Sequence, residues 1–230
     1  MNIRALQKTS LIDYPPYTVS VVFTGGCSFR CPFCHNPDAV LRFNELPEIK
    51  KEDVLKLVSE KKQWIDGVCI SGGEPCMQED LPDFCSALKE LNLRVKLDTN
   101  GSFPDMLRYL IENKLVDYIA MDIKASKNSY DKAAGVKVNM ENIEKSIELI
   151  KNSGIDYEFR TTAAPEIINK KEIFKIAKWL TPAKRYCIQQ FRNTTPLIDN
   201  KMQETSPYKE SGLKEFAEIA KPYFDEVILR

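Results

Sequence analysis

The sequence has little of what several common protein functions require. It contains one histidine, His35, in 230 residues, so a Ser-His-Asp triad or another His-based acid–base mechanism has little to draw on. It has no excess charge, because 33 Lys and Arg balance 33 Asp and Glu, and so no long-range field attracts nucleic acid or an anionic membrane. No apolar run is long enough for a signal peptide or a membrane span. We therefore expect a cytoplasmic protein without nucleic-acid or membrane partners.

Internal repeats, low-complexity tracts and Pro/Gly-rich linkers are also missing, so no position in the chain is marked as a domain boundary. A hydrophobic content of 43% against 29% charged residues is ordinary for a soluble globular enzyme. We expect residues 1–230 to form one domain.

Short β-rich runs alternate with amphipathic helical patterns along the chain, which predicts a parallel sheet with right-handed crossovers. Eight such units would need about 250 residues. Six units in this length predict an α/β fold, a partial (β/α)6 TIM-like barrel that is open on one side and can admit a protein segment. The expected strands are 19–23, 67–71, 94–98, 118–123, 157–161 and 186–190, preceded by an N-terminal segment and followed by a short strand at 227–229.

Unusual polar clusters occur where each expected strand ends, and this is the face on which parallel α/β barrels build their catalytic sites. The sequence therefore predicts that these segments surround one active site. They are residues 27–34, 72–75, 99–101, 122–124, 160–162 and 189–191.

The first of these segments carries three of the seven cysteines, Cys27, Cys31 and Cys34, in a chain with no export signal. An odd number of clustered cysteines favours metal binding over a disulfide framework. Three thiolates can hold three corners of a cubane iron–sulfur cluster and leave one iron open, whereas a structural zinc site normally takes four ligands. Zinc stays as the alternative, although His35 directly follows Cys34 and fits poorly as a fourth ligand.

With Phe33 just before the third cysteine, this segment resembles the signature of the radical S-adenosylmethionine (SAM) superfamily. The segments 10–15, 21–27 and 34–37 resemble more narrowly the activating enzymes of glycyl-radical enzymes, especially anaerobic ribonucleoside-triphosphate reductase activating proteins. That resemblance implies an oxidoreductase with SAM and a single 4Fe-4S cluster. Such an enzyme cleaves SAM by one-electron reduction to methionine and a 5′-deoxyadenosyl radical, which abstracts hydrogen from a glycine. It also implies a flavodoxin or ferredoxin-type electron donor.

The resemblance further assigns roles to the polar clusters. Gly72, Gly73 and Glu74 match the motif that binds the SAM amino group, although Gly72–Pro75 alone would be an ordinary turn. Asp98 and Thr99, together with Asp122, match a possible monovalent-cation site beside the SAM carboxylate. The expected cofactor contacts are Phe33, Gly72, Gly73, Glu74, Asp98, Thr99, Asn100, Lys124, Arg160 and Gln190. Among them, Lys124 and Arg160 would neutralise the SAM carboxylate, and Gln190 would line the adenosine pocket or hydrogen-bond to backbone.

Four other cysteines and the histidine receive no firm role. Cys76 follows the glycine motif where the family commonly carries Thr, which leaves open a second metal ligand but favours a small packing residue. Cys69, Cys85 and Cys187 lie within strand or helix patterns and are expected in the core. His35 is expected to pack beside the cluster.

Two rival functions stay open at this point. One is a radical SAM enzyme acting on a small molecule, such as a 7-carboxy-7-deazaguanine synthase. The other is a non-catalytic metal-binding module, in which Gly72–Pro75 is only a turn. A SAM-cleavage assay after anaerobic reconstitution separates the metal-binding module from the radical SAM functions, because a structural zinc protein would release no 5′-deoxyadenosine. The small-molecule enzyme differs in its substrate: an activase produces a glycyl-radical EPR doublet on a protein partner, whereas the synthase turns over a pterin.

Overall fold

The protein is described by a computed structural model that covers all 230 residues. Eight strands form one sheet in the order in which they occur in the chain, with β1 antiparallel to β2 and all later neighbours parallel. The strands are β1 (Ile3–Ser10), β2 (Val19–Thr24), β3 (Gly67–Gly72), β4 (Arg94–Thr99), β5 (Tyr118–Asp122), β6 (Asp156–Ala163), β7 (Ala183–Gln190) and β8 (Phe224–Leu229).

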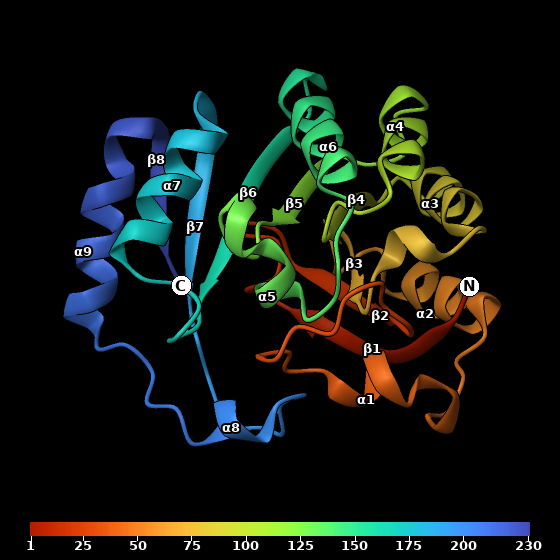
Figure 1. Cartoon of the computed structure of the whole chain (residues 1–230). Coiled ribbons are helices and arrows are strands. Elements are labelled where there is room, and N and C mark those ends of the chain that lie inside the picture. Colours follow the sequence, from red (N-terminus) through yellow and green to blue (C-terminus); the bar gives the residue numbers. More distant parts are fainter.

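Helices connect the parallel strands and cover the outer face of the curved sheet (Figure 1). In the picture α3, α4 and α6 lie along one part of the sheet, and α7 packs beside α9 at the other end. The helices are α1 (Pro37–Leu41), α2 (Lys51–Lys61), α3 (Leu81–Glu90), α4 (Pro104–Glu112), α5 (Tyr130–Ala134), α6 (Met140–Asn152), α7 (Lys170–Leu180), α8 (Asn200–Gln203) and α9 (Glu210–Ala220). None of them combines the length and apolar character needed to cross a membrane.

Strands β1 and β8 are the two edges of the sheet and do not pair with each other, so the barrel stays open. This confirms the predicted partial barrel. The six expected parallel strands and the final short strand are all present. The N-terminal segment, in contrast, is itself a strand, β1, which adds an antiparallel edge that the sequence pattern did not predict.

The two faces of the sheet are sorted by the alternation of strand side chains. Val95 and Leu97 of β4 join the main hydrophobic core beneath the helices. Lys96 and Asp98, the intervening residues, face a cavity on the inner side of the sheet. The inner face therefore carries charge near the carboxyl ends of the strands. Its apolar part is a separate small cluster of Tyr14, Val19, Val21, Cys69, Tyr118 and Ala120.

Candidate active site

A cavity of about 690 Å³ opens at the carboxyl ends of the strands, which is within the range of roughly 300–1,000 Å³ of small-molecule sites. The structure brings every residue expected to contact a cofactor or metal to this one cavity. Those lining residues are Cys27, Cys31, Phe33, Cys34, Gly72, Gly73, Glu74, Asp98, Thr99, Asn100, Asp122, Lys124, Arg160 and Gln190.

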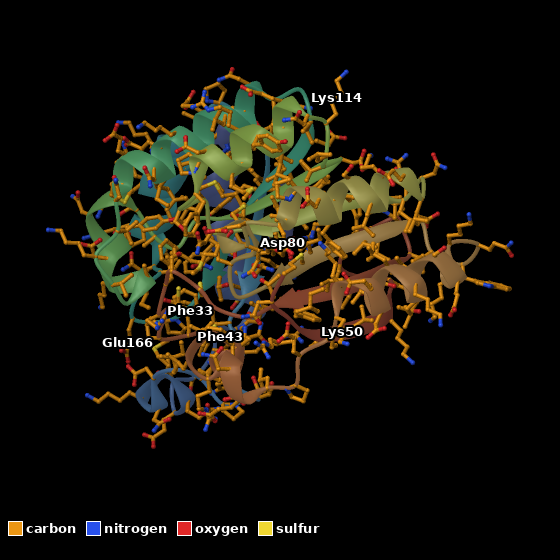
Figure 2. The ribbon with its side chains drawn as sticks, turned by 90° about the vertical axis from the view of Figure 1, so that its right-hand side faces the viewer. Phe33, Phe43, Lys50, Asp80, Lys114 and Glu166 are labelled. Carbon is orange, nitrogen blue, oxygen red and sulfur yellow. The ribbon has the colours of Figure 1, made fainter.

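The cysteine loop, Cys27–Cys34, is held from outside by backbone hydrogen bonds. Arg30 N–H donates to the carbonyl of Ala134 at the end of α5 (2.7 Å), and Asp199 N–H donates to the carbonyl of Pro32 (3.0 Å). In Figure 2, Phe33 of this loop lies at the opposite end of the ribbon from Lys114, which precedes β5. The loop is thus fixed at the catalytic end of the barrel by segments that are distant in sequence.

The three thiols are buried enough that burial raises their pKa values, to about 11 for Cys27 and about 12 for Cys31, with Cys34 also raised. A metal binds the thiolate, so metal binding must release these protons. No three His, Cys, Asp or Glu side chains gather around the position of a single ion. Three soft thiols at the wall of one large cavity fit the donor set of an iron–sulfur cluster.

Hydrogen-bond donors surround the sulfur of Cys27. The side-chain amide of Asn100 donates to Cys27 Sγ at 3.7 Å, and Phe29 N–H approaches it at 3.4 Å. Asn100 also donates to the hydroxyl of Ser28 (3.1 Å). Donors of this kind stabilise a thiolate ligand and influence the reduction potential of a bound cluster. The position of Asn100 therefore favours a role beside the cysteines.

The glycine motif after β3 packs directly on the cysteine loop. A Cβ at Gly73 would lie 1.9 Å from the carbonyl oxygen of Gly26, so only glycine fits. Glu74 N–H donates to that same oxygen, and Gly73 N–H donates to the carbonyl of Thr24, both at 2.8 Å. The family resemblance assigns Gly73 to the motif that binds SAM, and the contact between these two backbone loops by itself already requires glycine at this position.

The carboxylate of Glu74 is fully buried and connects two of the site loops. It accepts hydrogen bonds from Cys76 N–H (3.0 Å), the Thr99 hydroxyl (2.7 Å) and Asn100 N–H (2.7 Å). Burial raises the pKa of Glu74, while these three donors oppose the rise. Both carboxylate oxygens thus join the loop after β3 to the loop after β4. Cys76 is buried beside it and does not line the cavity.

Acidic and basic side chains alternate across the ends of β4, β5 and β6. Arg160 pairs with Asp122 through Nε (2.8 Å) and with Asp98 through a terminal nitrogen (3.3 Å). Lys124 Nζ lies 3.0 Å from Asp122. Burial would raise the pKa values of Asp98 and Asp122, but the neighbouring cations outweigh it and both are lowered. Lys124 and Arg160 correspondingly keep their charge, because burial lowers their pKa values less than the carboxylates raise them.

Two other expected residues contact backbone. His35 Nε2 hydrogen-bonds with the carbonyl of Arg192 (2.8 Å), and its ring stacks on Phe191. Gln190 donates to the carbonyl of Phe191 (3.0 Å) while lining the cavity. Both side chains therefore connect the cavity wall to the segment after β7.

Sequence reasoning missed several charged residues of the cavity wall. Lys96 and Arg230 were not singled out, yet both line the cavity. Arg230 forms a two-pronged pair with Glu158, at 2.7 and 2.9 Å. The available signal was their placement: Lys96 is two residues before Asp98 and so shares its face of β4, and Glu158 relates to Arg160 in the same way on β6.

Comparison with known proteins identifies the class to which this fold and site belong. Residues 21–180 match the family model of the Radical SAM superfamily. These residues are more than half of the chain, which therefore belongs to the radical SAM superfamily. Members of this superfamily are enzymes that use a 4Fe-4S cluster with SAM, so the alternative of a non-catalytic metal-binding module is set aside.

Relatives that match over nearly the whole chain narrow the class. A protein of Methanocaldococcus jannaschii with the provisional name of glycyl-radical enzyme activating enzyme is 35% identical over 228 residues, covering 96% of this chain and 92% of its own. The pyruvate formate-lyase-activating enzyme of Clostridium pasteurianum is 26% identical over 232 residues, covering 96% and 88%. The resemblance to radical SAM activating enzymes is thus confirmed.

Solved structures share the fold. The crystal structure of Streptococcus suis SuiB bound to its precursor peptide SuiA superposes with a TM-score of 0.73 over 91% of this chain, at 15% identity. The chain spans about half, 48%, of the length of SuiB. This similarity supports the open-barrel fold described above.

Proposed function

We propose that this enzyme activates a glycyl-radical enzyme by removing a hydrogen atom from one of its glycines, and that the target is an anaerobic ribonucleoside-triphosphate reductase. The observation that carries the general assignment is that three thiols and two cations, Lys124 and Arg160, line one cavity at the carboxyl ends of the barrel strands. The names of the full-length relatives support the activase role. The choice of reductase rests on the sequence resemblance of the first forty residues.

Different residues of the cavity would bind the cluster and SAM. Cys27, Cys31 and Cys34 would hold the cluster, and the two cations would hold the methionyl carboxylate of SAM by charge-assisted hydrogen bonds. When bound, the cluster would supply the electron that cleaves SAM to methionine and a 5′-deoxyadenosyl radical. This radical would abstract a hydrogen atom from the glycine. The barrel wall excludes water and other hydrogen donors from this space.

The open side of the barrel supports a protein substrate. Ile12, in the loop between β1 and β2, lines the cavity mouth and is 78% exposed, and its neighbour Leu11 is 69% exposed. Exposed apolar side chains next to a catalytic cavity suit contact with an extended polypeptide segment. All eight strands belong to one sheet, so we infer that residues 1–230 act as one catalytic domain, supplied with electrons by a flavodoxin or ferredoxin-type protein.

The experiment is anaerobic reconstitution with iron and sulfide, followed by SAM and a reductant, with 5′-deoxyadenosine measured by chromatography. Adding the candidate reductase should produce a glycyl-radical doublet in the EPR spectrum. If 5′-deoxyadenosine forms and the doublet appears only with another glycyl-radical enzyme, the reductase assignment is wrong. Turnover of a pterin with no doublet on any protein would favour the deazaguanine synthase.

Two cysteine variants provide the matched comparison. Cys31→Ala should lose the iron of the cluster and SAM cleavage, because a cavity-facing ligand is removed. Cys187→Ala removes a buried thiol of β7 that does not line the cavity, and it should retain both. Full iron content and SAM cleavage in Cys31→Ala would contradict the ligand assignment.

A further inference from the structure

The residues expected to hold a monovalent cation already have other partners. Asp98 lies beside Lys96 and Arg160, and Asp122 lies beside Arg160 and Lys124. The hydroxyl of the remaining residue of the expected site, Thr99, donates to Glu74. Each of the three expected ligands therefore already contacts another side chain.

Lys96 is a buried lysine directed along the inner face of the sheet toward this position. Its side chain is 3% exposed, and Nζ lies 2.8 Å from Asp98 Oδ1. The same ammonium donates to the backbone carbonyl of Asp13 (2.6 Å) and lies 6.0 Å from the centre of the Tyr118 ring. A carboxylate oxygen, a carbonyl oxygen and an aromatic ring are together a suitable environment for a cation of charge +1.

The geometry at Asp98 Oδ1 supports the same assignment. This buried oxygen receives no well-directed hydrogen bond, which by itself would mark it as a free ligand for a metal cation. Two nitrogen atoms nevertheless lie close to this oxygen, Lys96 Nζ at 2.8 Å and a terminal nitrogen of Arg160 at 3.3 Å. The space beside Oδ1 is filled by fixed positive charge.

The charge balance of the group also leaves no need for another cation. Two carboxylates, Asp98 and Asp122, face three cations, Lys96, Lys124 and Arg160, which leaves one positive charge (3 − 2 = 1). One positive charge complements the single carboxylate of SAM. A bound monovalent ion would raise the excess to two within a mostly buried group, where unbalanced charge is expensive.

We propose that the ammonium of Lys96 replaces the monovalent cation beside Asp98, so that the site binds SAM without sodium or potassium. Lys96 is then a positioning residue: it holds Asp98, and Asp98 helps to hold Arg160 at the SAM carboxylate. The part of this proposal that concerns SAM rests on the proposed function. The part that concerns cation binding can be tested on the protein alone.

The first test measures the thermal unfolding midpoint of the cluster-free protein in sodium, potassium or choline chloride at equal ionic strength. The wild-type protein should unfold at the same temperature in all three salts. Lys96→Met keeps most of the aliphatic stem and removes the ammonium, so its midpoint should be higher in sodium or potassium than in choline. Lys184→Met, which removes an exposed strand lysine paired with Asp156, should show no such difference.

Either of two results would overturn the proposal. One is a wild-type midpoint that is higher in sodium or potassium than in choline. The other is a Lys96→Met protein whose midpoint is the same in every salt. If Lys96→Met does not fold, Lys96→Arg takes its place in the comparison: it keeps the positive charge and should remain insensitive to the choice of salt, and sensitivity there would also reject the proposal.

The second test measures the dissociation constant of SAM by equilibrium dialysis with the reconstituted protein. The wild-type value should not change between choline and potassium chloride. Lys96→Met should bind SAM about tenfold more weakly in choline, the lower end of the effect of losing an outer-shell partner, and potassium should recover part of this loss. A protein that binds no SAM in any salt would reject the proposed function, while the unfolding comparison would still decide the role of Lys96.

Discussion

Replacing Gly73 with alanine tests whether contact between the glycine motif and the cysteine loop assembles the site. The new Cβ would lie 1.9 Å from the Gly26 carbonyl oxygen, whereas ordinary contact begins near 3.4 Å, so the loops must separate by about 1.5 Å (3.4 − 1.9). That movement breaks the hydrogen bonds from Glu74 N–H and Gly73 N–H to the cysteine side. Two such bonds contribute about 1–3 kcal/mol in total, and overpacking carries a similar cost.

We therefore expect Gly73→Ala to lower the stability of the cluster-free protein by about 2–6 kcal/mol, the two costs taken together. At about 2–4 °C per kcal/mol for a chain of this size, the thermal midpoint should fall by about 4–24 °C. The variant should also bind less iron on reconstitution, because the cysteine loop loses its support.

The matched control is Gly212→Ala in α9, where the new Cβ would meet only the Tyr208 side chain at 3.6 Å. Alanine is favoured over glycine in a helix by up to about 1 kcal/mol, so this variant should be as stable as the wild type or more stable. Differential scanning fluorimetry and iron analysis of the two variants decide the question. The reasoning is refuted if Gly73→Ala matches Gly212→Ala in both measurements.

Three further predictions address individual side chains. Asn100→Ala removes a hydrogen bond to Cys27 Sγ and should lower the cluster's reduction potential by about 40 mV, equivalent to roughly 1 kcal/mol for one electron. An EPR-monitored redox titration measures this potential, and an unchanged value would exclude an influence of Asn100 on the cluster. The folded-state pKa of Asp98 is lowered, so its stabilising contribution is present above its unfolded pKa of about 3.9 and is lost as pH falls through the folded value. The stability difference between wild type and Asp98→Asn should thus shrink between pH 5 and 3 in denaturant titrations, and a constant difference would count against the ion pair. Arg230→Met should lower the free energy of unfolding by about 2–3 kcal/mol, which is below the usual range for a buried pair because the arginine side chain is 34% exposed. Adding Glu158→Gln should recover part of that loss, and no recovery would show that the unpaired charge is not its cause.

The sequence predicted the parallel part of the fold well because buried strands and amphipathic helices give strong periodic patterns. Strand β1 escaped prediction for a physical reason: of Ile3–Ser10 only the two end residues are buried, so the strand reads as polar. The barrel's open edge followed from chain length, but its antiparallel strand did not.

The site was predictable in its location and less so in its internal contacts. Strand ends carrying cysteine, glycine and charged residues do meet at one cavity, as expected for a parallel barrel. The sequence could not show that the Glu74 carboxylate accepts hydrogen bonds from Thr99 and Asn100, since these bonds depend on how two loops pack. Lys96 was overlooked because a lysine within a strand usually faces solvent.

The backbone hydrogen bonds that hold the cysteine loop bear on whether the enzyme can regain a lost cluster. Arg30 and Pro32 are fixed by segments more than one hundred residues away, and these contacts involve no metal. The sulfurs are thus positioned by the polypeptide itself, unlike those of small zinc domains, which fold only around their ion. We therefore expect a molecule that loses its cluster to oxygen to keep this loop in place, so that it can accept a new cluster rather than be degraded and made again.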